Sequence, residues 1–178
     1  ETHRGFLGGL DTLGTTGKHA PYFSNSALEV VFHCPTLMPT KESDEQQVHK
    51  KRHVGNDHVH IVWSEHDRDY RSWTIRSQFN FVHIVIYPLS NYQFRIQIFQ
   101  KDDVPPFGPL VDGMIIDKSV LAPLVRMTAI NANRAVRYRE AMYKRPYPTR
   151  LHLINEIVER FKRTDVSNED FLMPLFSN

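Results

Sequence analysis

The sequence predicts an α/β fold in which a mixed central β-sheet is flanked by helices. Short apolar runs rich in β-branched residues alternate with longer stretches whose apolar residues recur at helical spacing. The 178 residues are 40% hydrophobic and 24% charged, which is typical of a folded globular protein long enough to bury a core. We therefore expect a single domain over residues 1–178, with strands and helices interspersed.

Composition and charge exclude several classes of function. Lys and Arg number 22 and Asp and Glu number 20, so no global field marks the chain as a nucleic-acid binder. No apolar run approaches the roughly 18 residues that cross a bilayer, so no transmembrane segment is expected. The first residues show neither an initiator Met nor an apolar signal core, which suggests a piece excised from a longer intracellular protein. The single cysteine, Cys34, is expected to be a small buried hydrophobe.

The first third of the chain predicts a loop, a strand and a helix. Residues 5–26 hold five of the eight glycines and predict a loop. Residues 27–34 are apolar and β-branched and precede Pro35, so they predict a mostly buried strand. Residues 40–55 begin with acidic and end with basic side chains, which suits a solvated helix that Gly55 would stop.

The middle of the chain predicts three strands and a loop. Apolar residues at 59, 61 and 63 alternate with histidines, which indicates a strand. Residues 79–87 are the most apolar run and predict a central strand covered on both faces. Residues 94–98 alternate and predict its half-exposed hairpin partner, and the prolines, aspartates and glycines of residues 102–113 predict a loop.

Two amphipathic helices are predicted after this loop. Apolar residues recur at helical spacing over residues 121–136, for more than four turns. A second stripe runs over residues 151–161, with basic side chains outside it. Because such a stripe requires burial, we expect the last helix to cover the sheet.

Two familiar kinds of site fit the sequence poorly. Residues 14–18 read Gly-Thr-Thr-Gly-Lys, but a P-loop needs a glycine where Thr12 stands and a Ser or Thr where His19 stands. His49 and His53 lie four residues apart on the predicted helix and could chelate a metal, yet no third ligand is evident. The sequence therefore predicts neither a bound nucleotide nor a metal.

Residues 50–57 read Lys-Lys-Arg-His-Val-Gly-Asn-Asp and offer a third candidate. By residue type alone, this run fits a basic helix end followed by an ordinary Asn-Asp turn. The run resembles, however, the Lys-Arg-His-x-Gly-Asn-Asp signature of the Rap-type GTPase-activating domains. Residues 101–109 are similar to the Asp-Asp-Val-Pro-Phe-Phe-Gly-Pro loop of the Rap and Ral branches of that family. Residues 8–11, 36–41 and 78–83 look like the tuberin branch, which acts on the small GTPase Rheb.

The resemblance implies a role for each residue of this run. Family members insert an asparagine, the Asn thumb, into the nucleotide site of a partner GTPase, and by position this catalytic residue is Asn56. A primary amide can accept from a water and donate to a phosphoryl oxygen without changing protonation, which suits this task. Gly55 would end a rigid helix that presents the amide, and His53 and Asp57 would support it. By residue type, His53 could equally be a solvated helix residue. The cations Lys50, Lys51 and Arg52 would meet acidic surface or phosphate on the GTPase, or equally form a solvated helix end.

The resemblance also implies the partners. The chain would supply a catalytic group in trans to a Rheb-like small GTPase, would not hydrolyse GTP itself, and would carry no intrinsic cofactor because GTP and Mg²⁺ belong to the partner. It implies a cytoplasmic role in TOR signalling, at endomembranes through a parent complex, and hamartin as a partner of regions outside this chain. Two alternatives stay open: Ral or Rap as the substrate, or a catalytically silent GTPase-docking module.

Overall fold

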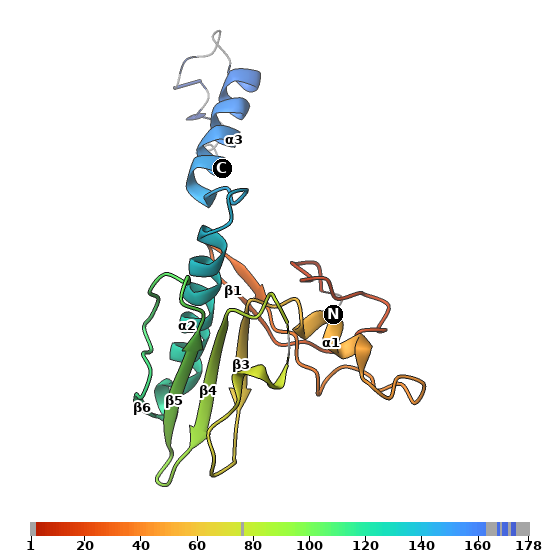
Figure 1. The fold of residues 1–178 in the computed structure, drawn as a ribbon. Helices are drawn as coiled ribbons and strands as arrows, with labels where there is room; N and C mark the ends of the chain where they lie inside the picture. Colours follow the sequence, from red (N-terminus) through yellow and green to blue (C-terminus); the bar gives the residue numbers. More distant parts are fainter. Residues whose placement is uncertain (1–2, 76, 163–166, 168, 171, 174–178) are drawn as a thin grey trace. The chain divides into compact units, whose positions relative to one another are not determined.

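The computed structural model describes residues 3–75, 77–162, 167, 169–170 and 172–173, and the chain divides into two compact units, residues 1–139 and 140–178 (Figure 1). The first unit holds both β-sheets and the helices α1 and α2, and the second holds α3. The larger sheet is mixed and is flanked by helix, which confirms the predicted fold class.

The larger sheet has the strand order β3-β4-β5-β6. Its strands are β3 (Val59–Trp63), β4 (Val82–Pro88), β5 (Gln93–Gln100) and β6 (Ile115–Asp117). β3 runs parallel to β4, and the other two pairs are antiparallel. The parallel pair requires a crossover, and residues 64–81 make it with a single 3-10 turn, η1 (Ser72–Thr74). Three of these strands lie where the sequence predicts them, and only the short β6 was not predicted.

β4 is the central strand and is buried on both faces, as predicted. Its residues from Val82 to Tyr87 are all buried. On one face, Val82, Ile84 and Ile86 join the hydrophobic core. On the other face lies His83, whose pKa burial lowers to about 4, so that it is neutral at physiological pH.

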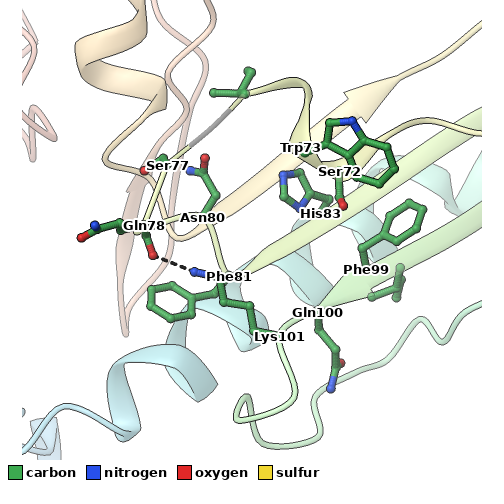
Figure 2. A pocket seen from close by; sticks show the side chains of 12 residues that line it. Ser72, Trp73, Ser77, Gln78, Asn80, Phe81, His83, Phe99, Gln100 and Lys101 are labelled. Atoms are coloured by element: carbon green, nitrogen blue, oxygen red, sulfur yellow. Dashed lines mark hydrogen bonds between the residues drawn. The ribbon is translucent and has the colours of Figure 1, made fainter.

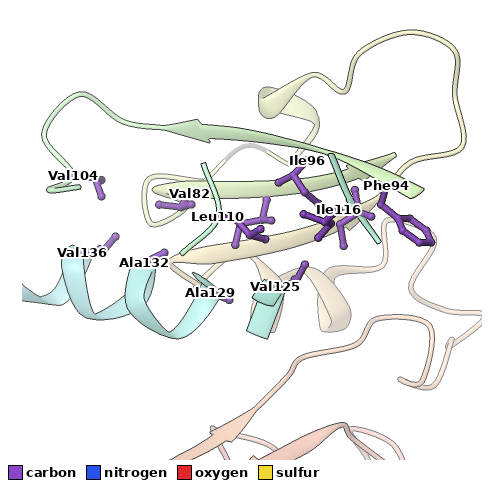
Figure 3. Close-up of a cluster of buried hydrophobic side chains, with 12 residues drawn as sticks. Val82, Phe94, Ile96, Val104, Leu110, Ile116, Val125, Ala129, Ala132 and Val136 are labelled. Atoms are coloured by element: carbon purple, nitrogen blue, oxygen red, sulfur yellow. The ribbon is translucent and has the colours of Figure 1, made fainter. Parts of the chain in front are cut away.

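α2 (Lys118–Tyr138) packs along one face of this sheet (Figure 3). The helix begins at Asp117, whose carboxylate accepts a hydrogen bond of 2.8 Å from the Ser119 amide. Its apolar stripe contributes Val125, Ala129, Ala132 and Val136 to the core. The predicted helix over residues 121–136 is therefore confirmed, and it is the main support of the sheet.

The predicted buried strand over residues 27–34 is wrong in length and burial. Only β2 (Glu29–Val31) forms, and it pairs with β1 (Tyr22–Ser24) inside the predicted loop, as a small antiparallel hairpin. The Asn25 carboxamide accepts from the amides of residues 27 and 28, which makes a tight turn between the strands. Cys34 lies beyond β2, is half-buried, and contacts the Thr36 hydroxyl rather than a hydrophobic core.

β3 places its apolar residues on the core face of the sheet, as its period-two pattern indicates. Val59, Ile61 and Trp63 are in register with Val82, Ile84 and Ile86 of β4, and Val59 packs against the hydrophobic cluster. Ile61 and Trp63 stay 40% and 53% exposed because β3 is an edge strand. His60 pairs with His83 on the other face, where it is buried and its Nε2 lies 2.8 Å from the Val54 carbonyl.

The second unit contains α3 (Pro146–Phe161), close to the predicted range. None of the residues of α3 is buried. The covering role that the sequence predicts for this helix stays a prediction. The exposed side chains of the stripe are Leu151, Leu153, Ile154, Ile157, Val158 and Phe161.

Candidate functional site

The candidate site is built around α1 (Val48–Val54), which is shorter than the helix predicted over residues 40–55. The chain forms turns before it, and Gln47 adopts a left-handed conformation at φ 55°. The Asp44 carboxylate accepts hydrogen bonds of 2.9 Å from the amides of Val48 and His49, and this lowers the pKa of Asp44. Asp44 thus caps the helix from a turn, where the sequence pattern suggested a first helical turn.

Gly55 ends α1 as predicted, in a very close approach to the preceding turn. Its amide donates to the Lys51 carbonyl at 2.7 Å, and a Cβ at this position would lie 2.6 Å from the same oxygen. Any larger residue would have to displace the backbone here. The glycine therefore lets the chain turn tightly and places the next residue directly at the helix end.

Asn56 is exposed at this helix end. Its Nδ2 donates to the Arg52 carbonyl at 2.8 Å, and its backbone amide donates to the His53 carbonyl at 3.1 Å. Because a carbonyl oxygen can only accept, the amide orientation is fixed, and Oδ1 points away from Arg52. Among the described residues, Oδ1 has no hydrogen-bond partner. The side chain is thus anchored through its donor, and its acceptor is presented.

The cations of α1 divide into two kinds. Lys51 and Arg52 are exposed, next to Asn56. Lys50 is partly buried, and its ammonium donates to the Thr40 hydroxyl at 2.7 Å. All three lie in or near the last turns of the helix, where cations interact favourably with the dipole. Lys51 and Arg52 therefore form the exposed basic edge of the site, and Lys50 ties the helix to the preceding loop.

Two histidines and one carboxylate connect the Gly55–Asp57 loop at the end of α1 to the N-terminal segment of the chain. His33 Nδ1 lies 2.9 Å from an Asp57 carboxylate oxygen, and His33 Nε2 donates to the Gly8 carbonyl at 2.9 Å. The Asp57 carboxylate raises the pKa of His33. The His53 ring packs 5.2 Å from the His33 ring, and burial, followed by the charge of His33, lowers the pKa of His53. Asp57 and His53 thus support the loop through His33.

A second support comes from the crossover between β3 and β4. The Ser77 hydroxyl donates to the Gly55 carbonyl, and Asn80 Nδ2 donates to the Asp57 carbonyl at 2.7 Å. Figure 2 shows both side chains in the wall of an open groove of about 970 Å³, which Trp73, Phe81 and Lys101 also line. The groove and the Gly55–Asp57 loop therefore share these two residues.

The loop at residues 101–109 is fastened to the core, and only its first residue, Lys101, lines the groove beside the site. The Val104 side chain is buried in the hydrophobic cluster, as is Leu110 just after the loop. The Gly108 carbonyl accepts from Asn131 Nδ2 at 2.8 Å, and the Leu110 amide donates to the Thr128 hydroxyl at 3.1 Å. The loop is thus fastened to α2.

The described residues offer neither a metal cluster nor a membrane-spanning helix. Among the described residues there is no cluster of three or more His, Cys, Asp or Glu side chains that could hold a metal ion. His49 lies 3.4 Å from the Lys41 ammonium, whereas His53 packs against His33. No helix of the part of the chain that the structure describes is long and apolar enough to span a membrane.

The family model for the Rap/ran-GAP domain matches residues 1–163. The chain belongs to the Rap/ran-GAP family. This Rap/ran-GAP domain is 48% identical over 175 residues to Ral GTPase-activating protein subunit alpha-1 of Rattus norvegicus, and 46% identical over 176 residues to subunit alpha-2 of Mus musculus. These matches cover 98% and 99% of the chain, which spans only 8% and 9% of the two relatives.

A solved structure of the TSC2 GAP domain is also similar to this Rap/ran-GAP domain. It has a TM-score of 0.69 and 33% sequence identity, over 75% of this chain and 73% of that chain. The family membership and the fold expected from the resemblance are therefore confirmed, whereas the sequence relatives are named for Ral rather than for Rheb.

The structure brings together Gly55, Asn56, Asp57 and His53 at one end of α1. It also adds His33, Ser77 and Asn80, to which no role was assigned from the sequence. Asn80 and Ser77 lie more than 20 residues along the chain from the loop they contact, so local spacing gives no signal of this contact. The sequence gives one indirect indication for Asn80, which is that it falls within residues 78–83, the stretch that looks like the tuberin branch of the family.

Proposed function

We propose that this Rap/ran-GAP domain accelerates GTP hydrolysis on a small GTPase by supplying the Asn56 carboxamide in trans. The observation that carries the proposal is the state of that amide, which is exposed, anchored through Nδ2 to Arg52, and open at Oδ1. GTP hydrolysis requires a water held in line with the γ-phosphate, and proteins contribute mainly positioning and electrostatics. Oδ1 is placed to accept a hydrogen bond from that water.

The surroundings of Asn56 support this role. The hydrogen bond to Arg52 fixes the side chain before the GTPase binds, so little rotamer freedom is lost on docking. Lys51 and Arg52 add positive charge beside the amide, which favours approach to an anionic nucleotide site. GTP and Mg²⁺ are supplied by the partner GTPase, and this domain holds neither.

A Ral-type GTPase is the substrate class we favour, because the two relatives at 46–48% identity are named as Ral GTPase-activating subunits. Rheb, the substrate implied by the resemblance of residues 8–11, 36–41 and 78–83 to the tuberin branch, is the second candidate. Hamartin as a partner outside this chain, TOR signalling and an endomembrane location follow only if Rheb is the substrate. All three stay predictions.

The test is single-turnover GTP hydrolysis by purified Ral, Rheb and Rap, each with the parent domain and with Asn56→Ala. We expect one GTPase to be accelerated, and the variant to lose on the order of 10²-fold in stimulated rate, as when other preorganised hydrogen-bonding groups are removed. Binding to the GTPase should persist, because Lys51 and Arg52 are intact. Equal stimulated rates for Asn56→Ala and the parent would contradict the proposal.

The same experiment distinguishes the proposed GTPase-activating function from the alternative of a catalytically silent docking module. Such a module would bind a GTPase without accelerating hydrolysis, and Asn56→Ala would then weaken only binding. Acceleration of Rheb alone would move the substrate to the second candidate and leave the mechanism unchanged.

A further inference from the structure

We infer that Ser77 and Asn80 are positioning residues that set where the Asn56 carboxamide lies, an inference that rests on the proposed function. Neither side chain contacts Asn56. Instead, both donate hydrogen bonds to the backbone on either side of it. They belong to the crossover between β3 and β4, so they connect the loop to the central strand of the sheet.

Asn80 holds the loop mainly through the Asp57 carbonyl. Its Nδ2 donates to that carbonyl at 2.7 Å, and it also lies 2.8 Å from His60 Nε2 and 3.3 Å from the Val54 carbonyl. His60 Nε2 in turn lies 2.8 Å from the Val54 carbonyl. Because Nδ2 has two hydrogens, one serves Asp57 and the other is directed at His60 and Val54. Asn80 thus fixes the residue after Asn56 and contacts the residue two positions before it.

Ser77 holds the Gly55 carbonyl, which lies between the Val54 and Asp57 carbonyls in the chain. Its hydroxyl donates to Gly55, the residue immediately before Asn56. The Phe79 amide donates to the same Ser77 oxygen at 3.0 Å, which leaves the hydroxyl hydrogen free to point at Gly55. The three fixed carbonyls, at residues 54, 55 and 57, bracket Asn56 on both sides.

The support itself is rigid because it is continuous with β4. The amides of Phe81 and Val82 both donate to the His58 carbonyl, at 2.9 and 3.0 Å, directly after the loop. Val82 is fully buried in the hydrophobic core. A displacement of the loop therefore requires either the loss of these hydrogen bonds or movement of the central strand.

Asn80 supports the loop through its Nδ2, whereas the other polar atom of its carboxamide, Oδ1, forms no hydrogen bond with the described residues. It is only 5% exposed, and its Oδ1 has no partner among the described residues. A buried acceptor without a partner destabilises a fold. The stabilising contacts of Asn80 are therefore those of Nδ2, to Asp57, Val54 and His60, and two of these residues flank Asn56 in the loop.

The consequence for the reaction is a rate effect that depends on Asn56. A misplacement of about 1 Å in a catalytic group can lower a rate by about 10²-fold. Removing one of several supports should have a smaller effect, on the order of tenfold for either Ser77→Ala or Asn80→Ala. The exposed cations that would dock the GTPase are untouched by either change.

The first experiment separates rate from docking. Single-turnover hydrolysis is measured over a range of domain concentrations with the GTP-loaded GTPase that responds in the panel of Ral, Rheb and Rap. We expect Ser77→Ala and Asn80→Ala to lower the rate at saturation about tenfold, with the half-saturating concentration unchanged within about twofold. Ser77→Thr, which keeps the hydroxyl, should restore most of the rate. A Ser77→Thr variant as slow as Ser77→Ala would overturn the role of the hydroxyl.

The second experiment places each change in the Asn56→Ala background. If Ser77 and Asn80 act only through Asn56, neither change lowers the residual rate further, so the effects are strongly non-additive. The same tenfold loss in both backgrounds would show general damage to the domain and would overturn the inference. Ser77 is only half-buried, so its variant gives an answer even if Asn80→Ala fails to fold.

The outcomes also separate this inference from the proposed function. If Asn56→Ala itself leaves the stimulated rate unchanged, the proposed function fails and this inference with it. If Asn56→Ala is slow but Ser77→Ala and Asn80→Ala are as fast as the parent, the inference alone fails.

Discussion

At the scale of single residues, Asn56 illustrates how a short side chain is presented at a helix end. The backbone must come close because the side chain has only two rotatable bonds, and Gly55 allows this by its approach to the Lys51 carbonyl. The hydrogen bond from Nδ2 to Arg52 then selects one orientation of the amide. Residue type alone predicts an ordinary turn here, and the resemblance to the Rap-type GTPase-activating domains nominates Asn56 and Gly55. They gave no information on this orientation, which depends on the helix carbonyl.

The contact between His33 and Asp57 predicts a pH-dependent stability. The carboxylate raises the pKa of His33 in the folded chain above its ordinary value of 6.5. Such a group stabilises the fold fully below pH 6.5, and this stabilisation is lost as the pH rises through the raised value. We expect Asp57→Asn to lower the free energy of unfolding by about 1 kcal/mol at pH 6 and by less at pH 8.5.

Denaturant unfolding of the parent and of Asp57→Asn at both pH values measures this difference directly. His33→Gln is the matched control, because it removes the titrating group from the other side of the contact and should abolish the same pH dependence. A difference between parent and Asp57→Asn that is constant from pH 6 to pH 8.5 would show that His33 protonation does not contribute.

At the scale of elements, the structure shows which patterns are sufficient to predict an element. β4 and α2 were predicted well, because a continuous apolar run and a stripe over more than four turns are specific signals. β2 was predicted too long, because residues 27 and 28 belong to the turn made by Asn25 and the partner strand β1 has only three residues. β3 was predicted correctly from its alternation, and its histidine, His60, lies on the face opposite the core, beside His83 and the Val54 carbonyl. α1 was predicted too long because Asp44 reads as a first-turn acid, whereas it caps the helix from outside.

The cap provided by Asp44 predicts a local effect on α1. A helix of seven residues has little stability of its own, so the loss of two hydrogen bonds to its first amides should matter. We expect Asp44→Ala to destabilise this element by about 1 kcal/mol. Hydrogen exchange at the amides of Val48 and His49 should become faster, with little change in β4.

Glu45→Ala is the matched control for this change. Glu45 is an exposed acid next to Asp44, and no hydrogen bond from it to α1 is found in the described structure. Its substitution removes the same charge from the same turn and should leave exchange at Val48 and His49 unchanged. Equal acceleration in both variants would assign the effect to charge near the helix start rather than to the cap.

At the scale of the whole molecule, the core belongs to one part of the chain. Every residue of the hydrophobic cluster lies between Val82 and Val136, within the unit formed by residues 1–139. The candidate site also lies within this unit, on α1 and on the crossover before β4. The second unit adds no residue to this cluster, and every residue of α3 is exposed. The single domain and the covering role of the last helix, which the sequence predicts because an apolar stripe normally requires burial, stay predictions.

This distribution predicts that residues 1–139 fold without the rest of the chain. Removal of residues 140–178 deletes the apolar stripe of α3 but no residue of the hydrophobic cluster. We expect the shortened chain to unfold cooperatively, with a Tm within about 3 °C of the parent, since 1 kcal/mol corresponds to about this shift for a domain of this size. Binding of an apolar dye should fall, because exposed apolar side chains are removed. A fall in Tm of more than about 10 °C would show instead that the second unit stabilises the first.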